Sequence, residues 1–286
     1  MALSETEQAV FSQIKVWEEQ FFTYEPTDFT VLYQEWVRNQ LAKVSPKWQS
    51  SLSQAIDQMV FQCHALLQST SWQQNARTQL INEGKALLPE INHIEDMKKL
   101  NVHQLHFIAQ KHIGKQRLIS TVQGGLTGTG GFLLLGLDIP LLFSIQMYTV
   151  QLIALTYGYE VTLPAEMVTA LKVFEIGLLP KQIKRSAWQD LEDEVIHTSV
   201  NPYFYEGQDD VMNLSWVDTG IKQLGKTIVI SQLKKKIFQG IPLMGMAFGA
   251  GFNYRSTKHI TEIAHRFYQK RYLMEKAGEG RVSQRT

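Results

Sequence analysis

The chain has 286 residues, enough to bury a sizeable core in one large domain or two small ones. Its formal net charge is +1, so no overall field draws it to nucleic acid. The single cysteine, Cys63, excludes an intrachain disulfide. The first residues, MALSETEQAVFSQIK, lack the apolar core of a secretory signal, so we expect a cytoplasmic location.

The first 91 residues read as a set of amphipathic helices. Ser4 and Glu7 have the spacing of a capping box, and apolar residues then recur at helical intervals as far as Phe22. Further helices are expected over 28–44, 45–68 and 71–88, where prolines mark the boundaries. Because no useful period-two alternation occurs anywhere, the sequence predicts an all-α protein.

A helix expected over 92–117 ends in a basic cluster and leads into an apolar stretch at 118–159. This stretch has one charge, Asp138, and six glycines in its first half. Gly124, Gly128 and Gly131 fall on one face of a helix, which would let a second helix or a lipid headgroup come close. Pro140 lacks an N–H, so we expect a break at 138–140 between a Gly-rich helix and a second apolar helix that ends at Gly158.

Two interpretations of this stretch remain open. Twenty uncharged residues precede Asp138, which is long enough to cross a bilayer. Gln123, Gln146 and Gln151 dilute the apolar character, however, and a buried or interfacial helical hairpin would show the same periodicity. Asp138 is either an ion or partner contact at a discontinuous helix or the N-cap of the helix that starts at Ile139-Pro140.

Helices are then expected over 164–179, 180–198 and 209–236, followed by a second charge-free stretch at 237–254. That stretch contains Pro242, Gly245 and Gly249 and lies between Lys234, Lys235 and Lys236 on one side and Arg255 on the other. A last basic helix is expected over 256–277, and a flexible tail over 279–286. The predicted architecture is a single helical bundle-like domain, with N-terminal helices over 1–91, a core over 92–278, and two apolar hairpins interrupted by Gly and Pro.

Two blocks of this sequence resemble the EcsC family of bacterial proteins. The first block consists of Gly124-Gly125, Gly130-Gly131, Asp138-Ile139-Pro140, Ile153-Ala154 and Tyr157-Gly158. The second consists of Ile241-Pro242, Gly245, Gly249-Ala250, Asn253, Ala264 and the segment 268–271. The resemblance covers most of the chain, although the first ninety residues fit only in helical character and length.

The resemblance implies a connection with membranes more than a chemistry. The founding member of the family is encoded beside the subunits of an ABC transporter, and its activity is not established. No catalytic residue or cofactor is implied. We therefore expect a non-enzymatic protein at the inner face of the cell membrane, as an accessory to ABC transporter subunits or another membrane partner, with lipid as a further candidate ligand.

The segment 220–227, GIKQLGKT, matches the spacing of a phosphate-binding P-loop. That loop needs a strand before it and an acidic residue after it to hold magnesium. Here Val217, Ile221, Leu224 and Ile228 keep helical spacing through the motif. We therefore interpret the match as coincidental, within a helix.

A metal site is the rival hypothesis. Glu194 with His197 and Glu262 with His265 form two Glu-x-x-His pairs, and Glu166 and Glu175 could complete a di-iron or di-manganese set. The alternative is two exposed polar pairs. The remaining candidates are weaker: His103, His106 and His112 lack companions for a zinc shell and are expected to be solvated, and Cys63 is expected to be buried.

The basic residues around the second apolar stretch predict an interfacial element. Lys234, Lys235, Lys236 and Arg255 could hold 241–252 against an anionic leaflet. A soluble core hairpin with solvated lysines is an equal alternative. A third class of function, a lipid-binding module with an apolar cavity, also stays open.

Overall fold

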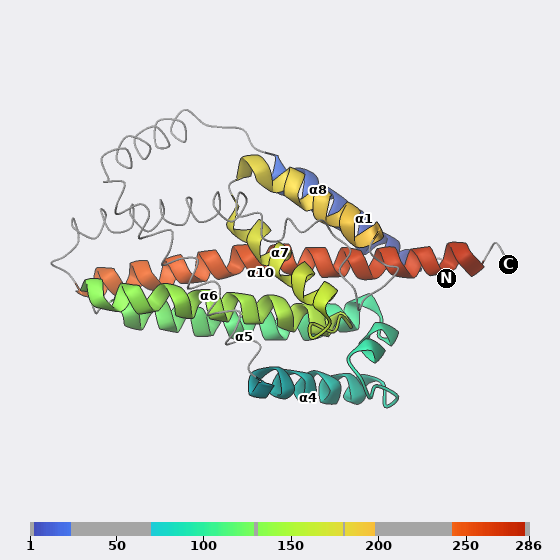
Figure 1. Cartoon of the computed structure of the whole chain (residues 1–286), viewed down its shortest axis with the longest axis horizontal. Helices are drawn as coiled ribbons and strands as arrows, with labels where there is room; N and C mark the ends of the chain where they lie inside the picture. The colour runs from blue at the N-terminus through green and yellow to red at the C-terminus, as the bar shows by residue number, and fades with distance from the viewer. Residues whose placement is uncertain (1–2, 24–69, 129–130, 180, 198–241, 284–286) are drawn as a thin grey trace.

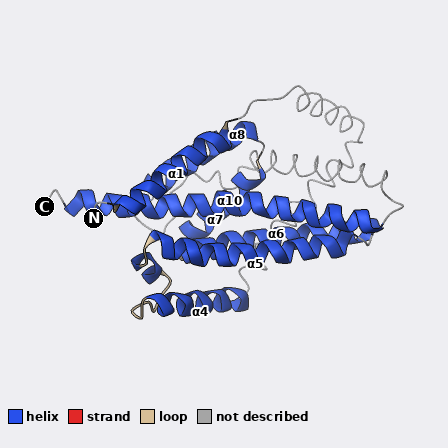
Figure 2. Ribbon diagram, turned by 180° about the vertical axis from the view of Figure 1, so that it is seen from behind, coloured by secondary structure: helices blue, strands red, loops and turns tan. Residues whose placement is uncertain are grey.

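The computed structural model describes residues 3–23, 70–128, 131–179, 181–197 and 242–283. In these ranges it has seven α-helices, one 3-10 helix and no strand, which confirms the all-α prediction (Figures 1 and 2). The elements are α1 (Glu5–Phe22), α4 (Thr70–Leu87), η1 (Glu95–Lys99), α5 (Val102–Gly128), α6 (Gly131–Thr156), α7 (Pro164–Leu178), α8 (Lys181–His197) and α10 (Pro242–Ser283). The helices expected over 28–44, 45–68 and 209–236 lie outside the described residues.

Three long helices, α5, α6 and α10, lie side by side and form the axis of the molecule (Figures 1 and 2). Gly124 of α5 lies against Gly249 of α10, and Arg117 lies against Lys258, so these two helices run antiparallel. Helix α6 returns beside α5 and runs parallel to α10. The N- and C-terminal ends of the described chain lie at the same end of this bundle.

The helix starts follow from polar side chains that satisfy the first backbone N–H groups. Ser4 and Glu7 form the predicted capping box, with the Glu7 N–H donating to Ser4 Oγ at 3.3 Å and the Ser4 N–H to Glu7 Oε2 at 3.0 Å. Asn101 does the same for α5: its Oδ1 accepts from the N–H groups of His103 and Gln104 at 3.0 Å. Helix α5 therefore starts after η1 and not at residue 92 as predicted.

Gly158 ends α6 where the sequence predicts. It has φ +82°, a backbone conformation that residues with a side chain rarely adopt. The N–H of Tyr159 donates to the Ala154 carbonyl and that of Gly158 to the Leu155 carbonyl, both at 3.0 Å, which is the Schellman pattern. The chain then turns into α7, which begins at Pro164 as expected.

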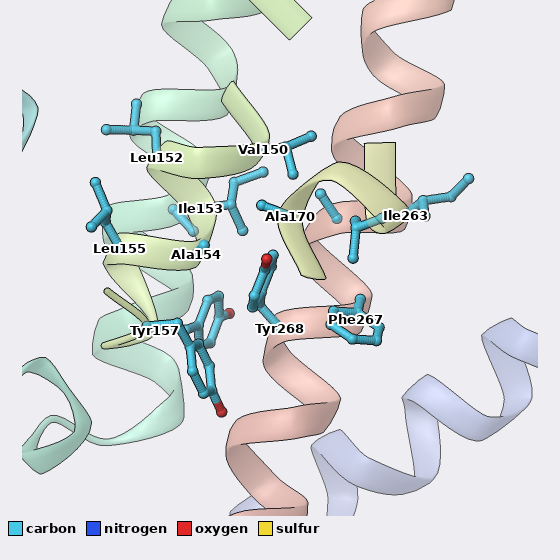
Figure 3. Close-up of a cluster of buried hydrophobic side chains, with 14 of the residues drawn as sticks. Val150, Leu152, Ile153, Ala154, Leu155, Tyr157, Ala170, Ile263, Phe267 and Tyr268 are labelled. Carbon is cyan, nitrogen blue, oxygen red and sulfur yellow. The ribbon is translucent and has the colours of Figure 1, made fainter. Parts of the chain in front are cut away.

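The hydrophobic core lies in the half of the bundle that is nearer the termini. There α6, α7 and α10 bring together Val150, Ile153, Ala170, Ile263 and Phe267 (Figure 3). Val150, Ala170 and Ile263 are completely buried. Burial of this apolar surface supplies the main driving force for packing α7 across the α6–α10 pair.

Helices α1 and α8 pack beside α10 through paired polar and aromatic contacts (Figure 1). Trp17 Nε1 donates to Glu262 Oε1 at 2.9 Å, and Trp188 Nε1 donates to Glu18 Oε1 at 3.1 Å. Lys276 Nζ reaches Glu7 Oε1 at 2.6 Å. These contacts connect the first described helix of the chain to the last one.

The predicted break at 138–140 is wrong, because α6 is helical through Asp138, Ile139 and Pro140. A proline inside a helix removes one hydrogen bond and crowds the carbonyl group four positions earlier, here that of Gly136. This local defect bends a helix but does not have to end it. Asp138 lies inside the helix and is therefore not its N-cap. Helix α5 ends at Gly128 and α6 begins at Gly131, so these two glycines stand on different helices and share no helical face.

The second apolar stretch is also more regular than predicted. From Pro242 onward it is the first part of α10, which continues without interruption to Ser283. The described part of this stretch is thus one arm of a single long helix, not a hairpin of its own. Helix α10 also continues past residue 279, where a flexible tail was expected to begin.

Candidate functional site

The end of the bundle farthest from the termini has an unusual distribution of polarity. We call this end the distal tip and define it by residues 118–128 of α5, 131–146 of α6 and 242–257 of α10. Figure 1 shows it as the end where the green α5 and α6 meet the orange start of α10. Side chains are described for 118–127, 141–146 and most of 246–257.

Glycine lets the helices of the tip approach closely. A Cβ atom on Gly124 would lie 2.6 Å from Cγ of Asn253 and closer still to the Gly249 carbonyl oxygen. Gly125 faces Ala250: a Cβ atom on Gly125 would lie 3.8 Å from the Cβ atom of Ala250, which is an ordinary contact distance. The prediction that Gly124 admits a second helix is confirmed, and the partner is the Gly249–Asn253 turn of α10.

The interior of the tip contains many buried polar side chains beside the buried Leu142, Phe143 and Ile145 of α6. Gln146 of α6 is fully buried and donates from Nε2 to Ser256 Oγ at 2.9 Å and to Thr257 Oγ1 at 3.3 Å. Asn253 and Ser120 are also fully buried. Among the described residues, Gln146 Oε1 finds no hydrogen-bond donor. Amides and hydroxyls of α5, α6 and α10 therefore fill positions in the tip where a soluble bundle would place leucines.

The exterior of the tip is apolar. Leu118 and Leu126 of α5 are 65% and 66% exposed, and Val122 lies between them on the same exposed stripe. Leu141 of α6 and Phe252 of α10 are about half exposed. In the part of the chain that the structure describes, no helix is both long enough and apolar enough to cross a bilayer.

Several predicted contact residues can be placed on this tip. Arg255 is exposed on α10, near the base of the tip. Pro242, Gly245 and Gly249 lie in the first turns of α10. Lys234, Lys235, Lys236, the P-loop-like segment 220–227 and Cys63 lie outside the described residues. Asp138 and Pro140 belong to α6, but their side chains also lie outside the description.

The structure gives the residues of the predicted metal site other neighbours. Glu194 pairs with Lys172 at 2.6 Å, and Glu262 accepts from Trp17. The His197 side chain is outside the described set. Within the described ranges, no three His, Cys, Asp or Glu side chains gather as they would around a metal ion. The metal site stays a prediction.

His265 belongs to a buried polar cluster and not to an exposed pair as one alternative expected. Its Nε2 lies 3.1 Å from the Tyr157 hydroxyl, and its ring lies 4.9 Å from that of His106. Burial, with the nearby positive charges of Arg266 and Arg117, lowers the pKa of His265 to about 3. His265 is therefore neutral at physiological pH, and Tyr157, a residue of the EcsC-like motif, helps to orient it.

The expectation of solvated histidines is wrong for His112. This side chain is buried, with Nε2 2.9 Å from Glu83 Oε2, and so ties α5 to α4. His103 is exposed as expected. No sequence pattern indicates the Glu83 partner, because it lies on a different helix.

A second buried cluster explains part of the 268–271 segment. Arg271 donates two hydrogen bonds of 2.6 Å to the carboxylate of Glu166, in a bidentate pair. The guanidinium also lies 4.0 Å from the ring of Tyr159, with Lys98 at 4.2 Å from that ring. Burial opposes the charge on Arg271, but the bonds to Glu166 and the charge nearby raise the pKa of Arg271 above its usual value. Glu166 is thus committed to an ion pair.

Glu175, the other carboxylate considered for a metal, has a different environment. Burial raises its pKa to about 7, against a smaller lowering by Lys172. Partial burial likewise raises the pKa of Glu192 to about 7, with Lys270 lowering it and Glu18 raising it further. Sequence reasoning did not single out the Glu18, Glu192 and Lys270 group, since its members come from three separate helices.

Comparison with known proteins places these features in a family. The chain is 28% identical over 242 residues to the uncharacterised protein YdbA of Bacillus subtilis, covering 84% of each chain. It is 26% identical over 190 residues to the protein EcsC of the same organism, covering 66% of this chain and 72% of that one. No solved structure matches the chain. Because the family model of the EcsC protein family matches residues 8–273, nearly the whole length, the chain belongs to the EcsC family.

Proposed function

We propose that this EcsC-family protein attaches to the cytoplasmic face of a membrane by inserting its distal tip among the lipids of one leaflet. The observation that carries the proposal is the reversed polarity of α5 and α10 in the tip, where both helices bury amides and hydroxyls and expose large apolar side chains. The other half of the bundle has an ordinary apolar core.

The reversed polarity is costly in water and favourable in lipid. A contiguous apolar surface on a protein usually marks a contact with a partner or a membrane. Between helices in lipid, hydrophobic burial gives no net gain, so small residues and side-chain hydrogen bonds hold the helices together. Gly124 and Gln146 supply these two kinds of contact, while Leu118, Val122 and Leu126 face outward.

The dimensions of the tip match one leaflet. From Leu118 to Gly128, α5 advances ~15 Å at the rise of an α-helix. The hydrocarbon core of a bilayer is about 30 Å thick, so the tip would reach roughly to its midplane. The backbone of the described tip is helical, which satisfies most of its polar groups internally as a lipid environment requires.

The first test compares Leu126→Gln with Phe107→Gln in a vesicle flotation assay. Both side chains are large, apolar and exposed on α5, at 66% and 69%, but Phe107 lies far from the tip. We expect Leu126→Gln to weaken vesicle binding by about tenfold, the lower limit for losing a buried leucine from lipid. Phe107→Gln should bind as the unmodified protein does, and equal unfolding midpoints would show that both variants fold.

Two results would overturn the proposal. One is an equal effect of both substitutions on binding, since the tip would then have no special role. The other is failure to bind vesicles made of lipid alone while binding to native membranes persists. That second result would indicate a membrane protein as the partner, such as the ABC transporter subunits suggested by the family resemblance.

A fluorescent probe can report insertion directly. In a Cys63→Ser background, a polarity-sensitive dye attached at Val122→Cys should shift to the blue when vesicles are added, because the probe enters hydrocarbon. The same dye at Gln110→Cys, exposed on α5 but away from the tip, should not shift. An unchanged spectrum at both positions would contradict insertion.

A further inference from the structure

Four basic residues from two distant parts of the sequence lie near the base of the distal tip. Lys115 and Arg117 come from α5, and Arg255 and Lys258 come from α10; we call them the basic collar. Arg117 Nη2 donates to the Lys258 carbonyl oxygen at 3.4 Å, and Arg117 Nε donates to Thr261 Oγ1 at 3.0 Å. Arg255 is one helical turn from Lys258, so all four residues lie at about the same level along the bundle.

The collar has little acidic charge around it on α5, α6 and α10: within the described ranges of these helices, Glu262, whose charge acts on Arg117, is the acidic residue next to it. Helix α5 contains no Asp or Glu, and α10 contains none before Glu262, which accepts from Trp17. Helix α6 has no charged residue between Asp138 and its end. In the described part of the chain, Lys115, Arg255 and Lys258 take part in no ion pair, whereas many other basic residues of these two helices, such as Lys111, Lys270 and Arg271, do.

We infer that the basic collar binds the phosphate groups of anionic phospholipids while the distal tip lies among their acyl chains. The inference rests on the proposed membrane attachment and adds the lipid class. From Arg117 to Gly128 the chain rises ~16 Å, so a tip that reaches the midplane holds the collar at the level of the headgroups. An arginine guanidinium matches a phosphate with two parallel hydrogen bonds, and each additional cation near an anionic surface strengthens attachment.

The collar would also make the protein prefer a negatively charged leaflet over a neutral one. Exposed apolar side chains alone would enter any bilayer. Exposed cations such as Arg255 and Lys258 gain most at a negatively charged leaflet, as the cytoplasmic leaflet is. The expected occupant is thus a bilayer that contains phosphatidylglycerol or a similar anionic lipid.

The test is the double variant Arg255→Gln with Lys258→Gln, measured against vesicles of phosphatidylcholine alone and vesicles that also contain phosphatidylglycerol. Its control is Lys85→Gln with Arg185→Gln, which removes the same charge from exposed sites on α4 and α8. We expect the collar variant to bind anionic vesicles roughly 25-fold more weakly, about fivefold for each cation lost. The control should lose far less, and the difference should shrink as salt is added.

The outcomes separate this inference from the proposed function. If the collar and control variants lose binding equally, or if the unmodified protein binds both kinds of vesicle with equal affinity, the collar does not recognise anionic lipid. Leu126→Gln would still weaken binding in that case, so insertion of the tip would survive. If Leu126→Gln has no effect and the collar variant does, attachment is electrostatic and the inserted tip is wrong.

Discussion

Replacing Gly124 by alanine tests the helix crossing on which the distal tip depends. The added Cβ would approach the Gly249 carbonyl oxygen and lie 2.6 Å from two atoms of Asn253. The asparagine side chain could rotate away, but the carbonyl belongs to the backbone of α10. The two helices would therefore have to separate by roughly 1 Å to restore a normal contact.

The expected magnitude follows from two opposing contributions. Alanine favours a helix over glycine by about 1 kcal/mol. Overpacking against backbone costs about 1–3 kcal/mol, and a rigid obstacle belongs to the upper part of that range. We expect Gly124→Ala to lower the free energy of unfolding by about 1–2 kcal/mol, or the melting temperature by about 2–8 °C for a chain of this size.

The control is Gly114→Ala, ten residues earlier on the same helix, where nothing lies within 4 Å of the added atom. That variant keeps the gain in helix propensity and should be more stable by up to about 1 kcal/mol. Urea unfolding followed by tryptophan fluorescence would measure both. If Gly124→Ala is stabilised as much as Gly114→Ala, then α5 and α10 do not cross at this glycine.

Three further predictions concern the other half of the bundle. Gly158→Ala should cost about 1–2 kcal/mol, because φ is +82° and its Cβ would press on Lys98; an unchanged unfolding midpoint would refute the turn. The pKa of His265 is lowered from near 6.5 to about 3, so across that window the unfolded chain takes up a proton that the folded chain refuses, and stability should fall as pH falls. His265→Phe should flatten that slope in unfolding measured at several pH values, and a parallel slope would contradict the burial of a neutral ring. Arg271→Met should cost about 3–5 kcal/mol by leaving Glu166 buried without its partner, and restoring most of this loss by a second change, Glu166→Gln, would identify the unpaired carboxylate as the cause.

Local signals in the sequence were sufficient for much of the secondary structure. The Ser4 and Glu7 pair, the start at Pro164 and the end at Gly158 all depend on residues within one or two turns, and all are confirmed. The Asn101 cap of α5 was missed, although the Asn101-x-x-Gln104 spacing resembles the capping box that was recognised at Ser4.

The predicted interruption at Pro140 failed because proline is a weaker signal inside a well-supported helix. Its backbone defect is confined to one missing hydrogen bond, and packing against the neighbouring helices can outweigh it. The same reasoning applies to α10, in which glycines at 245, 249 and 251 did not interrupt the helix. Propensity describes an isolated segment, whereas here three helices support one another.

The candidate site could be predicted only in part. The apolar stretches, Arg255 and the basic cluster at the end of the 92–117 helix were recognised from the sequence, but the contact of Arg117 with α10 was not, because Lys258 is about 140 residues away. The pairing of Arg271 with Glu166, 105 residues apart, was equally invisible. Such pairs depend on which helix faces which, and a periodic pattern gives only the face that is buried.

The contact between the first and last helices has a consequence for how the chain folds. Glu7 meets Lys276 across 269 residues of sequence, and Trp17 meets Glu262 across 245. On the ribosome α1 emerges well before α10, which makes part of the surface on which α1 docks. The hairpin of α5 and α6 can form from neighbouring segments, but α1 must wait with its apolar face uncovered. Such long-range closure is expected to be slow, so α1 should be among the last elements to become protected from hydrogen exchange during refolding.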